Sequence, residues 1–303
     1  MTPFSLSISG LCKTYPNGVR ALDDVSLAIP TGMFGLLGPN GAGKSTLMRT
    51  LATLQDADAG SARMGDVDVL RDKDAVRRML GYLPQDFGVY PKVSAEDMLD
   101  HLANLKGIAA RGERRDVVAT LLRQVNLWDV RRKALGGFSG GMRQRFGIAQ
   151  ALIGNPRLVI VDEPTAGLDP EERVRFHNLL AEIGENVIVI LSTHIVSDVS
   201  DLCANMAIID RGRVRLTGEP GTLTRALDGR VWQQAVPRDA LNAAKAAYPV
   251  ISTRLVAGRT LINVVADAAP APGFAPVEAT LEDVYFASIG DRLAAAPAAP
   301  VAA

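Results

Sequence analysis

The sequence predicts an α/β fold in which helices cross between the strands of a parallel sheet. Three short apolar runs, residues 33–37, 158–161 and 187–191, support this prediction. Each run is too short for a helix, and each ends abruptly in polar or glycine-rich sequence. In open α/β sheets, ligands bind at the carboxyl ends of the strands, so the segments after these runs are the first candidates for a site.

Composition narrows the class of protein. The chain has 303 residues, 48% of them apolar, with 33 basic and 33 acidic residues. This charge balance disfavours a protein whose main role is to bind the phosphate backbone of nucleic acid. The two distant cysteines, Cys12 and Cys203, suggest neither a zinc site nor a disulfide framework and fit a reducing compartment. No signal peptide and no apolar stretch of about 20 residues is found, so we expect a soluble protein whose membrane role, if any, needs a partner.

A helical insert is predicted between the first and second apolar runs. Ser94 is expected to cap a helix, with Asp97 three residues on. The predicted apolar stripe of this helix is Met98, Leu102 and Leu105, and that of the next helix is Val117, Val118, Leu121, Leu122 and Val125.

The character of the chain changes beyond about Thr217. Residues 230–236 and 255–265 are predicted as short strands around an Ala-rich helix, followed by a Pro/Ala linker at 266–276. The last ten residues are Ala and Pro apart from one valine, which predicts disorder. We therefore expect a main domain over 1–217, a small α+β appendage over 218–290 and a disordered tail over 291–303.

A glycine-rich loop follows the first apolar run. Its residues match the pattern GxxxxGK[ST] and are Gly38, Pro39, Asn40, Gly41, Ala42, Gly43, Lys44, Ser45 and Thr46. The glycines let backbone N–H groups surround phosphate oxygens at the N-terminus of a helix. Lys44 is expected to reach the β- and γ-phosphates and the Ser45 hydroxyl to ligate Mg²⁺. The sequence therefore predicts a nucleotide site.

The second apolar run ends in two carboxylates. In P-loop proteins an acid at the position of Asp162 holds Mg²⁺, and an acid at the position of Glu163 can polarise the attacking water. Asp169 then starts a new helix as its N-cap, with Pro170 in the first helical position.

A second anion-binding helix start is predicted at Ser139, Gly140 and Gly141. The chain thus has two predicted phosphate-binding segments. This suggests that two chains each contribute one such segment to a shared nucleotide. Taken alone this segment is weak evidence, because SGG is common in loops.

Together these motifs, in order between Leu6 and Leu216, resemble the ABC ATPase family. The resemblance implies an ATPase domain with a helical signature subdomain and a β-rich N-terminal part. It also implies that Gln85 contacts Mg²⁺ and the attacking water, that His194 contacts the γ-phosphate, and that Tyr15 stacks on adenine. Asp169 is implied at a dimer interface. Met142 stands where the most familiar signature has Gln, and we expect function to survive because Ser139 and the glycines make the phosphate contact.

Other parts of the chain indicate a branch of the family. Residues 87–91, which follow Gln85, resemble the region beside the groove that receives a membrane subunit. Residues 280–286 resemble the terminal motif of ATPases that serve drug, antibiotic and sodium exporters. Thr280 with Asp283 forms a capping box, and Leu281, Val284, Tyr285 and Ile289 form one helical face. His101 and His177 lie in helical patterns and are interpreted as structural.

The resemblance implies an ATP- and Mg²⁺-dependent subunit at the cytoplasmic face of the membrane. Its expected partners are a membrane-spanning permease and an identical or related ATPase subunit, without nucleic acid. A non-transport ABC ATPase acting in DNA repair or on ribosomes is the alternative, disfavoured by the single cassette and the lack of a long heptad run. A P-loop kinase is disfavoured by the second glycine-rich, phosphate-binding segment at 139–141 and by the pair Asp162 and Glu163.

Overall fold

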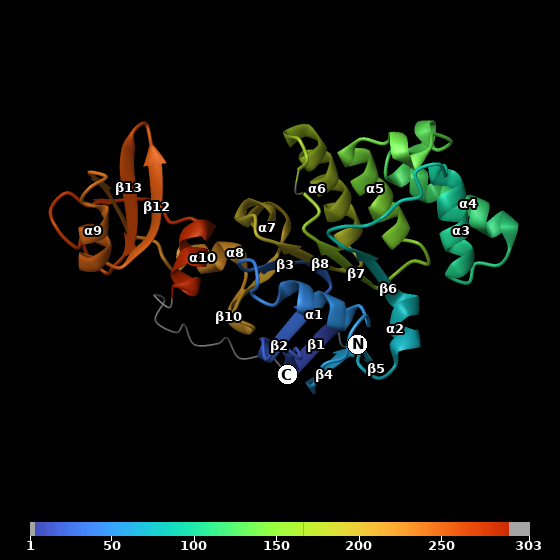
Figure 1. The fold of residues 1–303 in the computed structure, drawn as a ribbon, viewed down its shortest axis with the longest axis horizontal. Helices are drawn as coiled ribbons and strands as arrows, with labels where there is room; N and C mark the ends of the chain where they lie inside the picture. Colours follow the sequence, from blue (N-terminus) through green and yellow to red (C-terminus); the bar gives the residue numbers. More distant parts are fainter. Residues whose placement is uncertain (1–3, 166, 291–303) are drawn as a thin grey trace.

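A six-stranded sheet forms the centre of the molecule (Figure 1). The computed structural model describes residues 4–165 and 167–290, so the predicted tail at 291–303 lies outside the described residues. The strand order is β10-β9-β3-β8-β7-β6, parallel except for β10. The strands are β3 (Gly32–Leu37), β6 (Leu80–Leu83), β7 (Leu158–Asp162), β8 (Ile188–Thr193), β9 (Asn205–Asp210) and β10 (Arg213–Gly218).

Each face of this sheet has its own hydrophobic core. Because side chains alternate along a strand, Met33 and Leu37 of β3 pack into one core, while Phe34 and Leu36 pack into the other. Side chains of β3 are thus needed in both cores. This explains why β3 is apolar at nearly every position, as expected for a parallel strand in a sheet covered on both faces.

An antiparallel sheet with the order β2-β1-β4-β5 shares the second of these cores. Its strands are β1 (Ser5–Thr14), β2 (Arg20–Pro30), β4 (Ala59–Met64) and β5 (Val67–Asp68), and the neighbouring helices are α1 (Lys44–Leu51) and α2 (Lys73–Met79). Leu47, Met48 and Leu51 of α1 are fully buried in this core.

Helices cover the opposite face of the central sheet. They are α3 (Ala95–Leu105), α4 (Arg111–Gln124), α5 (Gly140–Ala151), α6 (Pro170–Gly184) and α7 (Val196–Leu202), with 3-10 turns η1 (Trp128–Val130) and η2 (Leu135–Gly137). Ser94 caps α3, as predicted.

The predicted apolar stripe of α3 is wrong in part. Leu105 is 69% exposed, and the buried residues are Ala95, Leu99 and Ala103. The buried face therefore lies one position away from the predicted stripe.

The C-terminal segment contains a sheet with a small core of its own. The order is β12-β13-β11-β14, and all pairs are antiparallel. The elements are α8 (Pro220–Arg225), β11 (Val231–Val236), α9 (Leu241–Ala247), β12 (Val250–Val256), β13 (Arg259–Val265), β14 (Ala275–Pro276) and α10 (Leu281–Ile289). α10 has the predicted capping box, and its Leu281, Val284 and Tyr285 join the core of the central sheet.

The predicted strand at 230–236 is confirmed as β11, and two further predictions for this segment are correct only in part. Residues 255–265 form the end of β12, a turn and β13, because Ala257 and Gly258 both have positive φ and reverse the chain. The predicted linker at 266–276 ends in β14, which pairs with Trp232 and Gln233 of β11.

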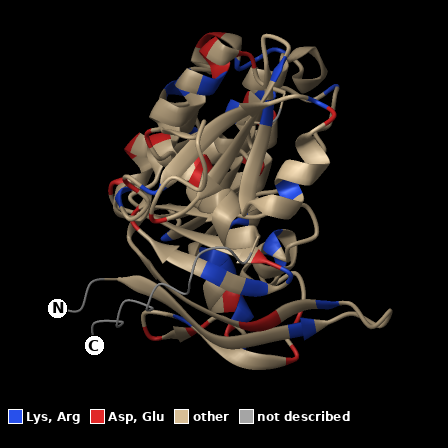
Figure 2. Cartoon of the chain, turned by 90° about the vertical axis from the view of Figure 1, so that its left-hand side faces the viewer, with Lys and Arg blue, Asp and Glu red and all other residues tan. Residues whose placement is uncertain are grey.

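Charge is mixed over the surface. Figure 2 shows basic and acidic positions close together on the same elements. None of the helices in the described part of the chain combines the length and the hydropathy that crossing a bilayer requires.

Candidate functional site

Glycines shape the loop between β3 and α1. Gly43 has φ 109°, and a Cβ there would lie 2.3 Å from the carbonyl oxygen of Ala21. A Cβ on Gly38 would lie 2.3 Å from the carbonyl oxygen of Ile209. Glycine at these two positions lets the loop run close to the neighbouring backbone and enter α1 directly. The first N–H groups of α1, which have no partner within the helix, favour an anion.

The side chain of Lys44 is held inside this loop. Lys44 is 5% exposed, and its Nζ donates to the carbonyl oxygens of Gly38 at 2.6 Å and Pro39 at 3.2 Å. Burial lowers the pKa of Lys44, while the charges of Glu163 and Asp162 oppose this shift. The structure therefore places one cation and two carboxylates at the same edge of the sheet.

Asp162, the last residue of β7, has an unsatisfied oxygen. Asp162 is 4% exposed, and its Oδ1 has no hydrogen-bond partner among the described residues. Burial raises the pKa of this carboxyl, and the charge of Glu163 acts in the same direction. The Ser192 and Ser45 hydroxyls and the charge of Lys44 oppose the rise. An orphaned carboxylate oxygen near the Ser45 hydroxyl fits a hard divalent cation such as Mg²⁺.

Glu163, His194 and Gln85 come together just beyond the strand ends. β7 and β8 are adjacent and parallel, with Asp162 opposite Ser192, so the residues that follow them are neighbours. His194 Nδ1 lies 3.2 Å from Glu163 Oε2, and Gln85 Nε2 donates to the same oxygen at 3.5 Å. The side chain of Glu163 is 13% exposed and that of His194 is 48% exposed. The carboxylate is therefore shielded while the imidazole faces solvent.

The backbone of Glu163 is strained. Its φ is 48°, in the left-handed region, and its N–H donates to the carbonyl oxygen of Ser192 at 2.8 Å. A non-glycine residue costs roughly 1–3 kcal/mol in such a conformation and keeps it only where the surroundings enforce it. Strain of this kind is concentrated at functional sites.

Tyr15 lies beside the start of α1. It follows β1, and its hydroxyl contacts Thr46 Oγ1 at 3.2 Å and Gln55 Oε1 at 3.2 Å. The half-buried ring is therefore anchored next to the glycine-rich loop, at a place from which it could contact a bound base.

Ser139, Gly140 and Gly141 belong to the start of α5, in the helical part. Ser139 Oγ accepts from the Met142 N–H at 3.2 Å, so Ser139 is the N-cap of α5. A Cβ on Gly141 would lie 2.3 Å from Glu172 Oε2, whereas a Cβ on Gly140 would meet nothing within 4 Å. No hydrogen bond or ion pair in the described part of the chain joins these residues to the loop at 38–46. The chain thus presents two separate anion-binding helix starts.

Asp169 caps α6, as predicted. Its Oδ1 accepts from the Glu172 N–H at 2.9 Å, and Pro170 occupies the first turn. Asp169 is exposed, so its surface is open to a second molecule.

The two aromatic residues after Gln85 have different environments. A Cβ on Gly147 of α5 would lie 2.7 Å from the Phe87 ring, so Phe87 packs closely on this helix. Tyr90 is 66% exposed. The prediction of a partner contact across 87–91 therefore rests on Tyr90.

One polar centre was not found from the sequence. Asp198, on α7, is fully buried and contacts Thr165, Thr193, Arg173 and His177. In the sequence it is only one of two aspartates in a polar run after His194. No local pattern shows that the chain buries it.

Known proteins resemble this chain in sequence. Residues 22–166 match the family model described as "ABC transporter". The chain is similar to the daunorubicin/doxorubicin resistance ATP-binding protein DrrA of Streptomyces peucetius, at 38% identity over 75% of this chain and 69% of that protein. It is also similar to the doxorubicin resistance ATP-binding protein DrrA of Mycobacterium tuberculosis, at 36% identity over 77% of this chain and 70% of that protein.

A solved structure shows the same fold. It is the dimeric post-hydrolysis state of the ATP-binding cassette MJ0796 bound to ADP and Pi. It is 25% identical to this chain and covers 71% of this chain and 98% of that one, with a TM-score of 0.64.

Proposed function

The chain belongs to the ATP-binding proteins of ABC transporters, and from this premise we propose that it powers the export of a drug-like or antibiotic compound through a separate membrane subunit. The chain is an ATPase, and ABC ATP-binding subunits dimerise and work with membrane subunits. Its proposed location is the cytoplasmic face of the membrane. The names of the two DrrA relatives refer to drug resistance, which supports export and gives no support to a role on nucleic acid or ribosomes.

The observation that carries the proposed site is the cluster at Glu163. Its shielded carboxylate lies just beyond the end of β7, 3.2 Å from His194 and 3.5 Å from Gln85. A carboxylate in this position can accept the proton of a water molecule as that water attacks phosphorus. A new bond then forms from the water oxygen to the γ-phosphorus, the bond to the β–γ bridging oxygen breaks, and ADP leaves with the electron pair.

The loop and its lysine supply the electrostatic part of catalysis. The first N–H groups of α1 and the ammonium of Lys44 are proposed to bind the β- and γ-phosphates and to stabilise the charge that develops on them. In this structure Lys44 Nζ is bonded to the Gly38 and Pro39 carbonyls, so phosphate binding replaces neutral acceptors with charged ones.

Mg²⁺ is proposed at Asp162, Ser45 and Gln85. The unpartnered Oδ1 of Asp162 and the exposed Ser45 hydroxyl are the oxygen donors that support this assignment. When bound, the ion would neutralise phosphate charge during phosphoryl transfer. Tyr15 is proposed to stack on adenine from its anchored position beside α1.

A second copy is proposed to complete each site. Among the described residues, no hydrogen bond or ion pair joins the helix start at Ser139, Gly140 and Gly141 to the loop at 38–46. A head-to-tail dimer would place this helix start against the partner's loop at 38–46. The exposed Asp169 is proposed to lie at the same interface. The solved cassette of similar fold is dimeric in a state bound to ADP and Pi, which supports a dimer.

A surface groove supports the contact with the membrane subunit. A cavity of about 440 Å³ lies between the central sheet and the helical insert, and the lining includes Leu54, Tyr82, Leu102, Leu105 and Gln150. Leu54 is 63% exposed and Leu105 is 69% exposed. We propose that a segment of the membrane subunit covers these two leucines. Since β6 lines this groove and leads directly to Gln85, movement there can reach the catalytic residues.

The groove assignment has a direct test. Leu105→Asp places a charge at an exposed position, so the fold and the ATPase rate of the isolated protein should be unchanged, while capture of the membrane subunit in co-purification should be lost. Leu255→Asp, at a position 71% exposed on β12 of the C-terminal segment, is the matched control. Equal capture by the two variants would contradict the assignment.

The catalytic assignment is tested by Glu163→Gln. The amide keeps the shape of the side chain but cannot accept the water proton, so turnover should fall by about 100-fold or more. ATP affinity should be preserved, because Lys44 and the loop remain. Glu182→Gln, at an exposed position on α6, is the control for the change itself. Turnover of Glu163→Gln at the rate of the control would refute the role of Glu163.

A further inference from the structure

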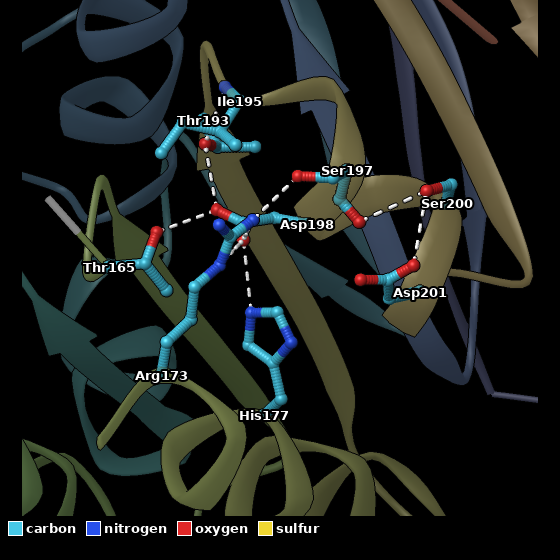
Figure 3. Close-up of polar contacts among 9 residues, drawn as sticks. All are labelled: Thr165, Arg173, His177, Thr193, Ile195, Ser197, Asp198, Ser200 and Asp201. Atoms are coloured by element: carbon cyan, nitrogen blue, oxygen red, sulfur yellow. Dashed lines mark hydrogen bonds and ion pairs between the residues drawn. The ribbon is translucent and has the colours of Figure 1, made fainter. Parts of the chain in front are cut away.

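Asp198 is a buried carboxylate whose two oxygens are both fully engaged (Figure 3). Its side chain is 0% exposed. Oδ1 accepts from Arg173 Nε at 2.9 Å and Nη2 at 2.6 Å, and it lies 3.0 Å from His177 Nε2. Oδ2 accepts from Thr165 Oγ1 at 2.6 Å and from Thr193 Oγ1 at 3.3 Å. A buried charge with this many partners holds them in a defined geometry.

The two oxygens connect different parts of the fold. Oδ1 joins α7 to α6, which supplies Arg173 and His177. Oδ2 joins the ends of two neighbouring strands, because Thr165 follows β7 and Thr193 ends β8. The carboxylate therefore lies between the helices α6 and α7 and the two loops that carry the catalytic side chains.

Both loops are held next to those side chains. Thr165 is two residues after Glu163, and Thr193 directly precedes His194. Thr193 Oγ1 also accepts from the Ile195 N–H at 3.0 Å, so the backbone is tied on both sides of His194. Arg173 Nη2 further donates to Ser197 Oγ at 2.6 Å, which fixes the first turn of α7.

We propose that Asp198 is a positioning residue, which sets the spacing between the Glu163 carboxylate and the His194 imidazole through its bonds to Thr165 and Thr193. This inference rests on the proposed roles of Glu163 and His194. Those side chains are 3.2 Å apart in the structure, a separation that depends on how two loops are placed relative to each other. A displacement of about 1 Å in a catalytic group can cost about 100-fold in rate, so the placement matters for turnover.

A merely structural role makes a different prediction. If the cluster served only to stabilise the fold, weakening it would lower the melting temperature and the fraction of protein that binds ATP, without changing kcat per binding-competent molecule. If Asp198 positions the catalytic pair, breaking one threonine bond should lower kcat while KM and ATP affinity stay close to those of the wild type.

The test uses Thr193→Val, which removes the hydroxyl but keeps the branched shape suited to β8. It should lower kcat by about 10-fold or more, with ATP affinity within about 3-fold of wild type. Thr193→Ser restores a hydroxyl and should recover most of the loss. Thr165→Val breaks the bond to the other loop and should act in the same direction. Asp201→Asn is the matched control, because Asp201 is an exposed aspartate on the same helix whose Oδ1 accepts from Ser200 Oγ at 3.3 Å, away from the Asp198 cluster (Figure 3).

The outcomes separate this inference from the function on which it rests. If Thr193→Val and Thr165→Val both keep the kcat of the control while Glu163→Gln is inactive, the positioning role is wrong and the catalytic assignment stands. If Glu163→Gln is itself active, the proposed site is wrong. Failure of Thr193→Ser to recover turnover would also overturn the positioning role, because the hydroxyl would then not be the group that matters.

Discussion

Gly140 and Gly141, at the start of α5, allow a prediction that separates an effect on folding stability from an effect on ATP turnover. A Cβ on Gly141 would lie 2.3 Å from Glu172 Oε2 and 2.5 Å from its carboxyl carbon. Glu172 cannot move freely, because its Oε1 is bound to the buried Arg145 Nη2 at 3.3 Å. Gly141→Ala is therefore an overpacking change, which typically lowers the free energy of unfolding by about 1–3 kcal/mol.

Gly140→Ala is the matched comparison. A Cβ at this position would meet nothing within 4 Å, and the residue starts the same helix. Its effect on the free energy of unfolding should be neutral or a gain of up to about 1 kcal/mol, since Ala is a better helix residue than Gly. In the proposed dimer, however, the exposed face of Gly140 meets the partner's nucleotide, so an added methyl group should lower turnover.

Denaturant unfolding and steady-state ATP hydrolysis, measured on both variants, test this reasoning. Gly141→Ala should be destabilised, whereas Gly140→Ala should be stable and impaired in turnover. If Gly140→Ala has the turnover of the wild type, the proposed contact in trans is wrong. If the two variants have equal stability, the close packing of Gly141 on Glu172 is not a constraint on the folded chain.

Three further predictions concern charged and thiol groups. The folded-state pKa of Asp162 is raised by burial, so this group stabilises the fold most below its unfolded pKa, and the contribution is lost as pH rises through the folded value. Asp162→Asn should therefore raise the melting temperature of the nucleotide-free protein at neutral pH, and raise it by less at acidic pH. The same change should abolish Mg²⁺-dependent turnover. A lower melting temperature of Asp162→Asn at neutral pH would contradict this reasoning. Lys44→Ala should weaken ATP binding in calorimetry by roughly 30-fold or more through loss of a charge-assisted contact, and unchanged affinity would exclude the phosphate-binding role. Burial raises the pKa of Cys203 to about 12, so an alkylating reagent at neutral pH should modify only the partly exposed Cys12 in the native protein and both thiols after denaturation; rapid native labelling of Cys203 would show that its site opens.

Much of the fold could be predicted because its signals are local. The strands β3, β7 and β8 are nearly continuous apolar runs, a pattern that parallel strands buried on both faces require. The caps at Ser94, Asp169 and Thr280 depend only on residues within one helical turn, and the structure confirms the bond that each makes.

Features that depend on packing could not be predicted in this way. The buried face of α3 includes Ala95 and Ala103, and hydropathy does not show that these small residues, rather than Leu105, face the core. Phe87 packs on α5 only because Gly147, far along the chain, leaves room for the ring.

The same reasoning applies to the site. Glu163 could be identified as a candidate because it follows a strand, whereas the left-handed backbone that places it is visible only in the structure. Asp198 could not be identified, because its partners Thr165, Arg173 and His177 come from other segments and only the fold brings them together. A buried carboxylate and a solvated one look alike in a sequence.

The central claim is that two copies share ATP at sites built from Lys44 and Glu163 of one chain and Ser139 to Gly141 of the other. The most direct measurement is the molar mass of Glu163→Gln in solution with and without ATP and Mg²⁺, by light scattering. The account predicts a monomer without nucleotide and a stable dimer with two bound ATP molecules, and it predicts that adding the Gly140→Ala change weakens this dimer. A Glu163→Gln protein that binds ATP but stays monomeric would contradict the shared site.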